Sequence, residues 1–139
     1  MEPRISFVTL GVSDLERATR FYRDVLQLPQ QPTPPTVSFF ELGGTWLALY
    51  PRDLLAADAG VEPDGSGFPR FALAHNVRSP EEVDQLLEEV KKGGGKIVKP
   101  GHQANWGGYT GYFADPEGFL WEVAWNPHWK LDKRGNVKL

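Results

Sequence analysis

Few side chains in this sequence are suited to acid–base or metal chemistry. The 139 residues include three histidines, His75, His102 and His128, and no cysteine, which excludes disulfides, thiolate metal sites and a cysteine nucleophile. No two histidines have the spacing of paired metal ligands, and neither a glycine-rich phosphate loop nor a nucleophile elbow is present. The acid whose position best predicts a chemical role is Glu122, inside a strand pattern in the second half of the chain.

Glu122 draws attention because the chain repeats itself weakly. Each half opens with a short apolar strand and closes with a strand that runs from a glycine to a proline. Aligning the halves pairs Phe7 with Ala72 and Ala48 with Glu122, so three of these four equivalent positions are apolar. We therefore expect a solitary carboxylate in apolar surroundings, which suits a general base, a general acid or a ligand contact. An ion pair with a lysine or arginine is the alternative.

Both halves predict the same order of elements, a strand, a helix and three further strands. The helices begin at capping boxes, Ser13 with Glu16 and Ser79 with Glu82, in which the serine accepts from a free backbone N–H and the glutamate reaches back. Alternating and β-branched residues predict the strands. These strands are Ile5–Val12, Val37–Leu42, Thr45–Tyr50, Arg70–Val77, Lys96–Lys99, Gly108–Ala114 and Phe119–Trp125.

The length predicts one domain over residues 1–139. Its parts are module one at about 4–52, a linker at 53–67 with a helical turn at Asp53–Ala59, module two at about 68–127, and a C-terminal tail at 128–139. Two βαβββ modules can bury their exposed strand edges together and leave a concave surface. The predicted fold class is therefore α+β, with two βαβββ modules forming a curved mixed sheet around a cleft.

Composition narrows the possible partners. A net charge of −3 and a pI near 5.6 argue against nucleic acid, which requires clustered cations. No apolar run approaches the roughly 20 residues of a membrane span. The residues before the first strand lack the basic and then apolar pattern of a signal peptide, so we expect none. The lack of cysteine fits a cytoplasmic protein. The tail carries four basic residues against one acidic residue.

Two segments resemble the vicinal oxygen chelate superfamily, which includes glyoxalase I, extradiol dioxygenases and bleomycin-resistance proteins. The stretch from Phe7 to Leu26 is similar to its opening, and Asp-Pro-Glu-Gly-Phe-Leu-Trp-Glu, ending at Glu122, is similar to its closing motif. The resemblance implies paired βαβββ modules around a cleft, often in a homodimer.

The resemblance also places metal ligands at four strand positions, which here carry Phe7, Ala48, Ala72 and Glu122. Zinc sites use about three or four protein ligands, and Fe(II) oxygenase sites use two histidines and a carboxylate. Because only Glu122 could bind an ion, we predict no metal and no other cofactor. A divalent metal completed by His102 or by a partner subunit is the alternative.

Side-chain alternation predicts the residues that face the cleft. With Glu122 as the catalytic candidate, the expected ligand contacts are Phe7, Thr9, Trp46, Ala48, Tyr50, Ala72, Asn76, Trp106 and Tyr109. Trp106 lies in the glycine-rich cluster Asn105–Tyr112, where glycines allow loop motion. We expect His75 to be a core histidine on the opposite face and His102 to lie in a loop, Pro100–Gly107.

An apolar floor, aromatic walls and few polar groups are typical of a small-molecule pocket. The sequence therefore predicts a protein that has lost most metal ligands of the superfamily and binds an apolar or aromatic small molecule in its cleft. The alternative is a lyase, isomerase or dioxygenase-like enzyme that uses Glu122 as general base, or a metal completed by other residues.

Overall fold

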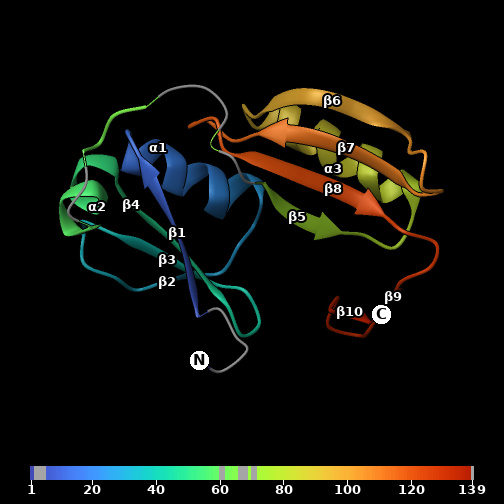
Figure 1. Ribbon diagram of the computed structural model, residues 1–139, viewed down its shortest axis with the longest axis horizontal. Helices are drawn as coiled ribbons and strands as arrows, with labels where there is room; N and C mark the ends of the chain where they lie inside the picture. Colours follow the sequence, from blue (N-terminus) through green and yellow to red (C-terminus); the bar gives the residue numbers. More distant parts are fainter. Residues whose placement is uncertain (2–5, 60–61, 66–68, 70–71, 139) are drawn as a thin grey trace. The chain divides into compact units, whose positions relative to one another are not determined.

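The computed structural model describes residues 1, 6–59, 62–65, 69 and 72–138. The chain forms two compact units, Met1–Gly67 and Phe68–Leu139, and each contains one βαβββ module with a four-stranded mixed sheet (Figure 1). The α+β fold class and the two βαβββ modules are therefore confirmed. Several predicted positions lie outside the described residues, namely the strand starts Ile5 and Arg70, Phe71, the module limits 4 and 68, and residues 60–61 and 66–67 of the linker.

The first unit orders its strands β1-β4-β3-β2, with β1 parallel to β4 and the other pairs antiparallel. One face of this sheet is buried against the first helical segment, which consists of α1 and η1. The ring centroids of Tyr22 in η1 and Phe40 in β3 lie 6.0 Å apart. Its elements are β1 (Phe7–Val12), α1 (Leu15–Arg20), η1 (Phe21–Val25), β2 (Gln30–Gln31), β3 (Ser38–Glu41), β4 (Trp46–Pro51) and α2 (Arg52–Ala59).

The first helix differs from its prediction in two ways. Its N-cap is Asp14 and not Ser13, because the Asp14 carboxylate accepts the backbone N–H of Arg17 at 2.9 Å. A carboxylate at this end also interacts favourably with the helix dipole. At Phe21 the α-helix gives way to the π-helical turn η1, in which the Leu26 N–H donates to the Phe21 carbonyl at 3.1 Å.

The predicted helical turn in the linker is a complete helix, α2. A Cβ at Gly11 would lie 3.2 Å from Leu55 Cδ2 and 3.3 Å from Arg52 Cα. The absence of a side chain at Gly11 therefore lets α2 pack closely against the end of β1.

The second unit orders its strands β5-β8-β7-β6, with β5 parallel to β8. Helix α3 packs on β6, β7 and β8 (Figure 1), and β9 and β10 form a separate hairpin in the tail. The elements are β5 (Leu73–Asn76), α3 (Pro80–Lys92), β6 (Lys96–Gln103), β7 (Tyr109–Ala114), β8 (Leu120–Trp125), β9 (Lys130–Leu131) and β10 (Val137–Lys138). Strand β6 extends past its predicted end, so His102 lies in a strand and not in the predicted loop.

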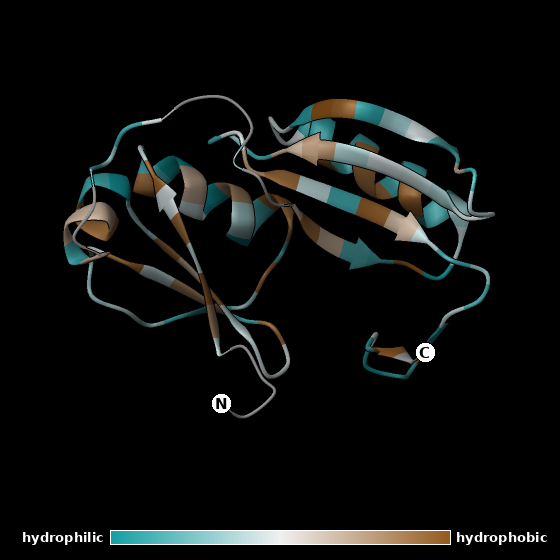
Figure 2. Cartoon of the chain, viewed as in Figure 1, coloured by the Kyte–Doolittle hydropathy of each residue, from teal (hydrophilic) through white to brown (hydrophobic). Residues whose placement is uncertain are grey.

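Helix α3 begins at Ser79, as predicted. Ser79 Oγ accepts the Glu82 N–H at 3.3 Å, and the Glu82 carboxylate accepts the N–H of Arg78 at 2.8 Å. Hydrophobic and hydrophilic residues lie side by side along this helix (Figure 2), and its buried side chains include Val83 and Val90. Among the described residues, no helix combines the length and the apolar character that a membrane span requires.

Candidate ligand site

Strand register places Glu122 on the face of the second sheet that is turned away from α3. Glu122 pairs with Tyr112 of β7 and with Ala74 of β5, and side chains alternate between faces along each strand. The adjacent residues Phe113 and Val123 point to the other face and are 1 % and 0 % exposed. The face of Glu122 therefore also carries Ala74, Asn76, Thr110, Tyr112 and Ala124.

Glu122 is half-buried and contacts two hydroxyl groups. Thr110 Oγ1 lies 2.8 Å from Glu122 Oε1 and 3.1 Å from the Val123 carbonyl oxygen. Burial, followed by the charge of Glu122 and a side-chain hydrogen bond to it, raises the pKa of Tyr112. Tyr112 is therefore protonated at neutral pH and can donate a hydrogen bond to the carboxylate.

A cavity of about 440 Å³ lies directly beside Glu122 in the second unit. It is lined by Ala74, Asn76, Trp106, Glu122, Ala124, Asn126 and Trp129. A neighbouring cavity of about 340 Å³ shares Glu122 and Trp106 and adds Lys99, His102, Thr110 and Tyr112. Glu122 therefore contributes to two adjoining cavities, one bounded by indole rings and one by more polar side chains.

Trp106 is positioned by a tight turn between β6 and β7. The Ala104 N–H donates to the Gly108 carbonyl at 2.8 Å, and the Gly107 N–H donates to the Ala104 carbonyl at 3.1 Å. A Cβ at Gly108 would occupy the space of the Trp106 ring, so glycine is needed for the ring to lie against the backbone there. The indole is nevertheless 44 % exposed and therefore accessible to a ligand.

The C-terminal tail contributes Trp129 to the lining of this cavity, although the sequence pattern does not predict it as a site residue. The backbone N–H of Trp129 donates to the Asn126 carbonyl at 3.2 Å. The Arg78 guanidinium donates to the backbone carbonyl of Asp132 at 3.0 Å. The Arg78 contact holds the tail against the segment that precedes α3. Trp129 is 43 % exposed, so a second indole lines the cavity beside Glu122.

Five of the predicted contacts lie on one face of the first sheet, namely Phe7, Thr9, Trp46, Ala48 and Tyr50. With Phe39, two of them form an aromatic cluster, in which the Phe7 ring centroid lies 5.3 Å from that of Phe39 and 6.0 Å from that of Trp46. Phe7 is 46 % exposed. These residues belong to the first unit, and their contribution to ligand binding at Glu122 stays a prediction.

Three other predicted residues lie in positions that differ from the expected ones. Tyr109 lies on the opposite face from Glu122, because its hydroxyl donates to the Asp84 carboxylate of α3 at 3.0 Å. His75 also faces that side, but it is exposed on the edge strand β5 and is not the expected core residue. Although the residue is exposed, nearby protein atoms desolvate its ring in part and lower the pKa of His75, and the charge of Glu82 opposes this shift. Ala72 precedes β5 and is exposed.

Sequence reasoning could have found Thr110 and Tyr112 from the turn that joins β7 to β8. Ala114 pairs with Leu120 across this turn. Counting two residues outward from that pair in each strand brings Tyr112 opposite Glu122. For Trp129 no comparable signal exists, because it lies outside the strand pattern.

The residues at the metal positions of the superfamily do not fit a metal ion. Phe7, Ala48 and Ala72 have no donor atom in their side chains, and the carboxylate of Glu122 already accepts from Thr110. No group of three or more histidine, aspartate or glutamate side chains within the described ranges is arranged to hold one. A single carboxylate is too small a donor set for zinc or Fe(II).

Known proteins resemble this chain over most of its length. A glyoxalase-related enzyme from Fulvimarina pelagi is 36 % identical with a TM-score of 0.91, covering 99 % of this chain and 98 % of that one. Metallothiol transferase FosB from Shouchella clausii is 31 % identical, covering 86 % of this chain and 77 % of its own length. Lactoylglutathione lyase from Agrobacterium tumefaciens is 25 % identical with a TM-score of 0.71, covering 95 % and 100 % of the two chains. The model of the Glyoxalase/Bleomycin resistance protein/Dioxygenase superfamily matches residues 4–123, and the chain belongs to this superfamily.

Proposed function

We propose that the protein binds a small organic molecule with an aromatic or apolar part in the cavity beside Glu122. The observation that carries this proposal is a carboxylate that shares one cavity with two partly exposed indole rings, those of Trp106 and Trp129. Ala74 and Ala124 supply small apolar walls. A volume of about 440 Å³ lies within the range of small-molecule pockets, which are mainly apolar with a few polar groups.

The same residues indicate the kind of group that the ligand presents. A carboxylate accepts hydrogen bonds and favours a donor or a cation. Indole faces favour stacked rings, and they also attract cations. We therefore expect a ligand with a planar or apolar body and a hydrogen-bond donor, preferably cationic, directed at Glu122.

Three further features belong to this proposal. Ala72 and the aromatic cluster of the first unit also contact a ligand. The protein forms a homodimer, and it is located in the cytoplasm. Ligand contact by the aromatic cluster is supported by the exposure of Phe7 on a sheet face that the first helix does not cover.

We also propose that ligand binding uses no metal. Purified protein should contain zinc, manganese, iron and nickel at levels well below one ion per chain when measured by mass spectrometry of the digested protein. Incubation with excess Zn²⁺ followed by dialysis should leave the content unchanged, because one carboxylate does not retain the ion. A stoichiometric metal that is lost in Glu122→Gln would instead favour a metal site completed by His102 or by a partner subunit.

The indole rings provide the direct test of ligand binding. A thermal-shift screen of aromatic metabolites should identify a compound that raises the Tm, because a ligand of the folded state stabilises it. Trp106→Ala and Trp129→Ala should each weaken the binding of this compound by about 1–3 kcal/mol, as for other aromatic contacts in binding sites. Isothermal titration measures the affinity, and Leu54→Ala, an exposed substitution on α2, is the control. Unchanged affinity in both tryptophan variants would remove this cavity from the proposal.

A second candidate function is catalysis with Glu122 as general base. The arrangement of Thr110 and protonated Tyr112 around the carboxylate favours it, because both hydroxyl groups can donate to Glu122 and hold it in one orientation for proton abstraction. Two of the related proteins are named as a transferase and a lyase. Proton abstraction would incorporate deuterium at the reacting carbon of the bound compound in D₂O, whereas a binding protein would leave the compound unlabelled.

A further inference from the structure

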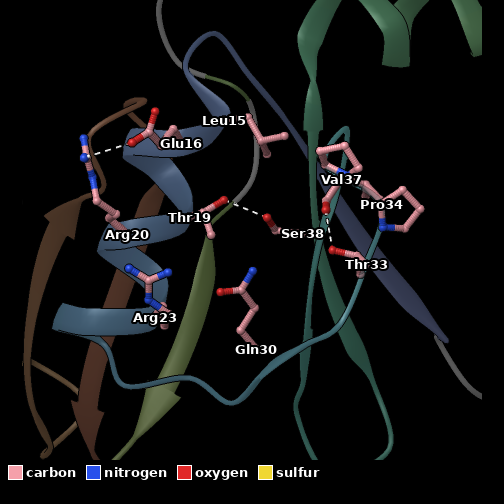
Figure 3. Close-up of a pocket in the computed structure, with 11 residues that line it drawn as sticks. Leu15, Glu16, Thr19, Arg20, Arg23, Gln30, Thr33, Pro34, Val37 and Ser38 are labelled. Atoms are coloured by element: carbon pink, nitrogen blue, oxygen red, sulfur yellow. Dashed lines mark hydrogen bonds and ion pairs between the residues drawn. The ribbon is translucent and has the colours of Figure 1, made fainter.

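A separate cavity of about 560 Å³ lies in the first unit, between the first helical segment and the chain that leads into β3 (Figure 3). Its polar lining includes Arg20, Arg23 and Gln30, and its apolar lining includes Leu15 and Val37. It lies on the helix-covered side of the first sheet, while Glu122 belongs to the second unit. The proposed function therefore does not use it.

The floor of this cavity is polar and internally satisfied. Thr19 Oγ1 and Ser38 Oγ are hydrogen-bonded at 2.7 Å, and the two residues are 8 % and 5 % exposed. Beside them, Thr33 Oγ1 donates to the Val37 carbonyl at 2.6 Å and closes the loop that forms one wall (Figure 3). A ligand would therefore enter a site with fixed walls and would not have to break these bonds.

The cavity also offers hydrogen-bond donors that remain available. Arg23 uses Nε and Nη2 to hold Asp24 at 2.6 and 2.7 Å, and Arg20 uses Nη1 to hold Glu16 at 3.1 Å. A guanidinium has five N–H groups, so both arginines keep further donors. Gln30 lies across from Arg23 (Figure 3), and its side-chain amide has no hydrogen-bond partner among the described residues.

The acidic neighbours do not block an incoming anion. Arg23 and Asp24 are 46 % and 55 % exposed at their side chains, and Arg20 and Glu16 are 58 % and 82 % exposed. Ion pairs this exposed contribute little to stability. A ligand anion can therefore share or replace these acids, and it would gain the bidentate geometry that guanidinium groups favour.

We propose that this cavity binds a small organic anion, a carboxylate or a phosphate ester, with its charged group at Arg23 and Gln30. Its apolar part lies against Leu15 and Val37. A cationic ligand is disfavoured by the two guanidinium groups. The inference is independent of ligand binding at Glu122.

Nuclear magnetic resonance provides separate reporters for the two sites. In ¹⁵N-labelled full-length protein, benzoate or phenyl phosphate should shift the Gln30 side-chain amide and the Arg23 Nε–H signals in a saturable way. The indole N–H signals of Trp106 and Trp129 report on the other cavity. Benzyl alcohol, which is neutral, should produce no saturable shift at Gln30. Higher salt should weaken the binding of the two anions, because screening reduces the attraction between opposite charges. A response to only one anion identifies which charged group the site takes.

Substitutions then test the residues that carry the proposal. Arg23→Gln and Gln30→Ala should each lower the affinity for the anion that shifts Gln30 by about tenfold, the effect of one lost charged hydrogen bond. Arg17→Gln removes a positive charge from the same helix outside the cavity and should keep the affinity of the natural protein. The proposal is overturned if neither anion shifts Gln30 saturably, if benzyl alcohol does so equally, or if Arg17→Gln causes the same loss as Arg23→Gln.

Discussion

Replacing Phe113 with alanine should lower the free energy of unfolding by about 3–5 kcal/mol, the usual cost of deleting a buried aromatic ring. Phe113 is 1 % exposed and lies on the α3 face of the second sheet. Its ring is parallel to that of Trp121, with centroids 6.1 Å apart and an interplanar angle of 1°. The substitution therefore removes both the buried area and a stacked aromatic contact.

The matched control is Phe7→Ala, a phenylalanine on a sheet face that the first helix does not cover. Phe7 is 46 % exposed and contacts mainly Phe39 and Trp46, so its loss should cost only about 1 kcal/mol, the scale of an aromatic pair. Urea denaturation followed by circular dichroism measures both variants, provided that each curve shows a single transition. An equal cost for Phe7 would mean that its face is covered in solution, which would contradict an open ligand surface there.

Replacing Glu122 with glutamine should lower the affinity for a cationic or hydrogen-bond-donating ligand by about 10–100-fold, the contribution of one charged hydrogen bond. Glutamine has nearly the same shape, and its carbonyl oxygen can still accept from Thr110. The cavity should therefore persist while its negative charge is lost. Isothermal titration with the compound found by thermal shift measures the change.

The same variant separates binding from catalysis. If Glu122 is a general base, kcat should fall by about 10²–10⁴-fold while affinity changes little. Glu88→Gln is the control, because Glu88 is exposed on α3 and pairs with Lys92; it should alter neither quantity. Normal binding and normal turnover in Glu122→Gln would show that this carboxylate has no role in the site.

Much of the fold could be predicted because its signals are local. The repeat, the period-two strands and the amphipathic stripe of α3 each depend on neighbouring residues, and the structure confirms the two βαβββ modules. Ser79 was recognisable as a cap for the same reason. Two equally local details were wrong. Asp14 competes successfully with Ser13 for the first cap, and the bulged strand β6 continues through Pro100 to Gln103.

The composition of the site was only partly predictable. Asn76, Trp106 and Glu122 were predicted as site residues, and they line one cavity. Tyr109 was predicted to share the face of Glu122, but the pairing of β7 with β8 places Tyr112 on that face and Tyr109 on the other. An error of one position in that register exchanges the two faces.

The sequence by itself determined the elements and their amphipathic faces, since each depends on residues close together in the chain. Only the tertiary structure decided which side chains surround the carboxylate. Thr110 reaches it through strand pairing, and Trp129 reaches the same cavity through a tail held by Arg78. Such contacts join distant segments, and their geometry arises from packing and hydrogen bonding that no local pattern encodes.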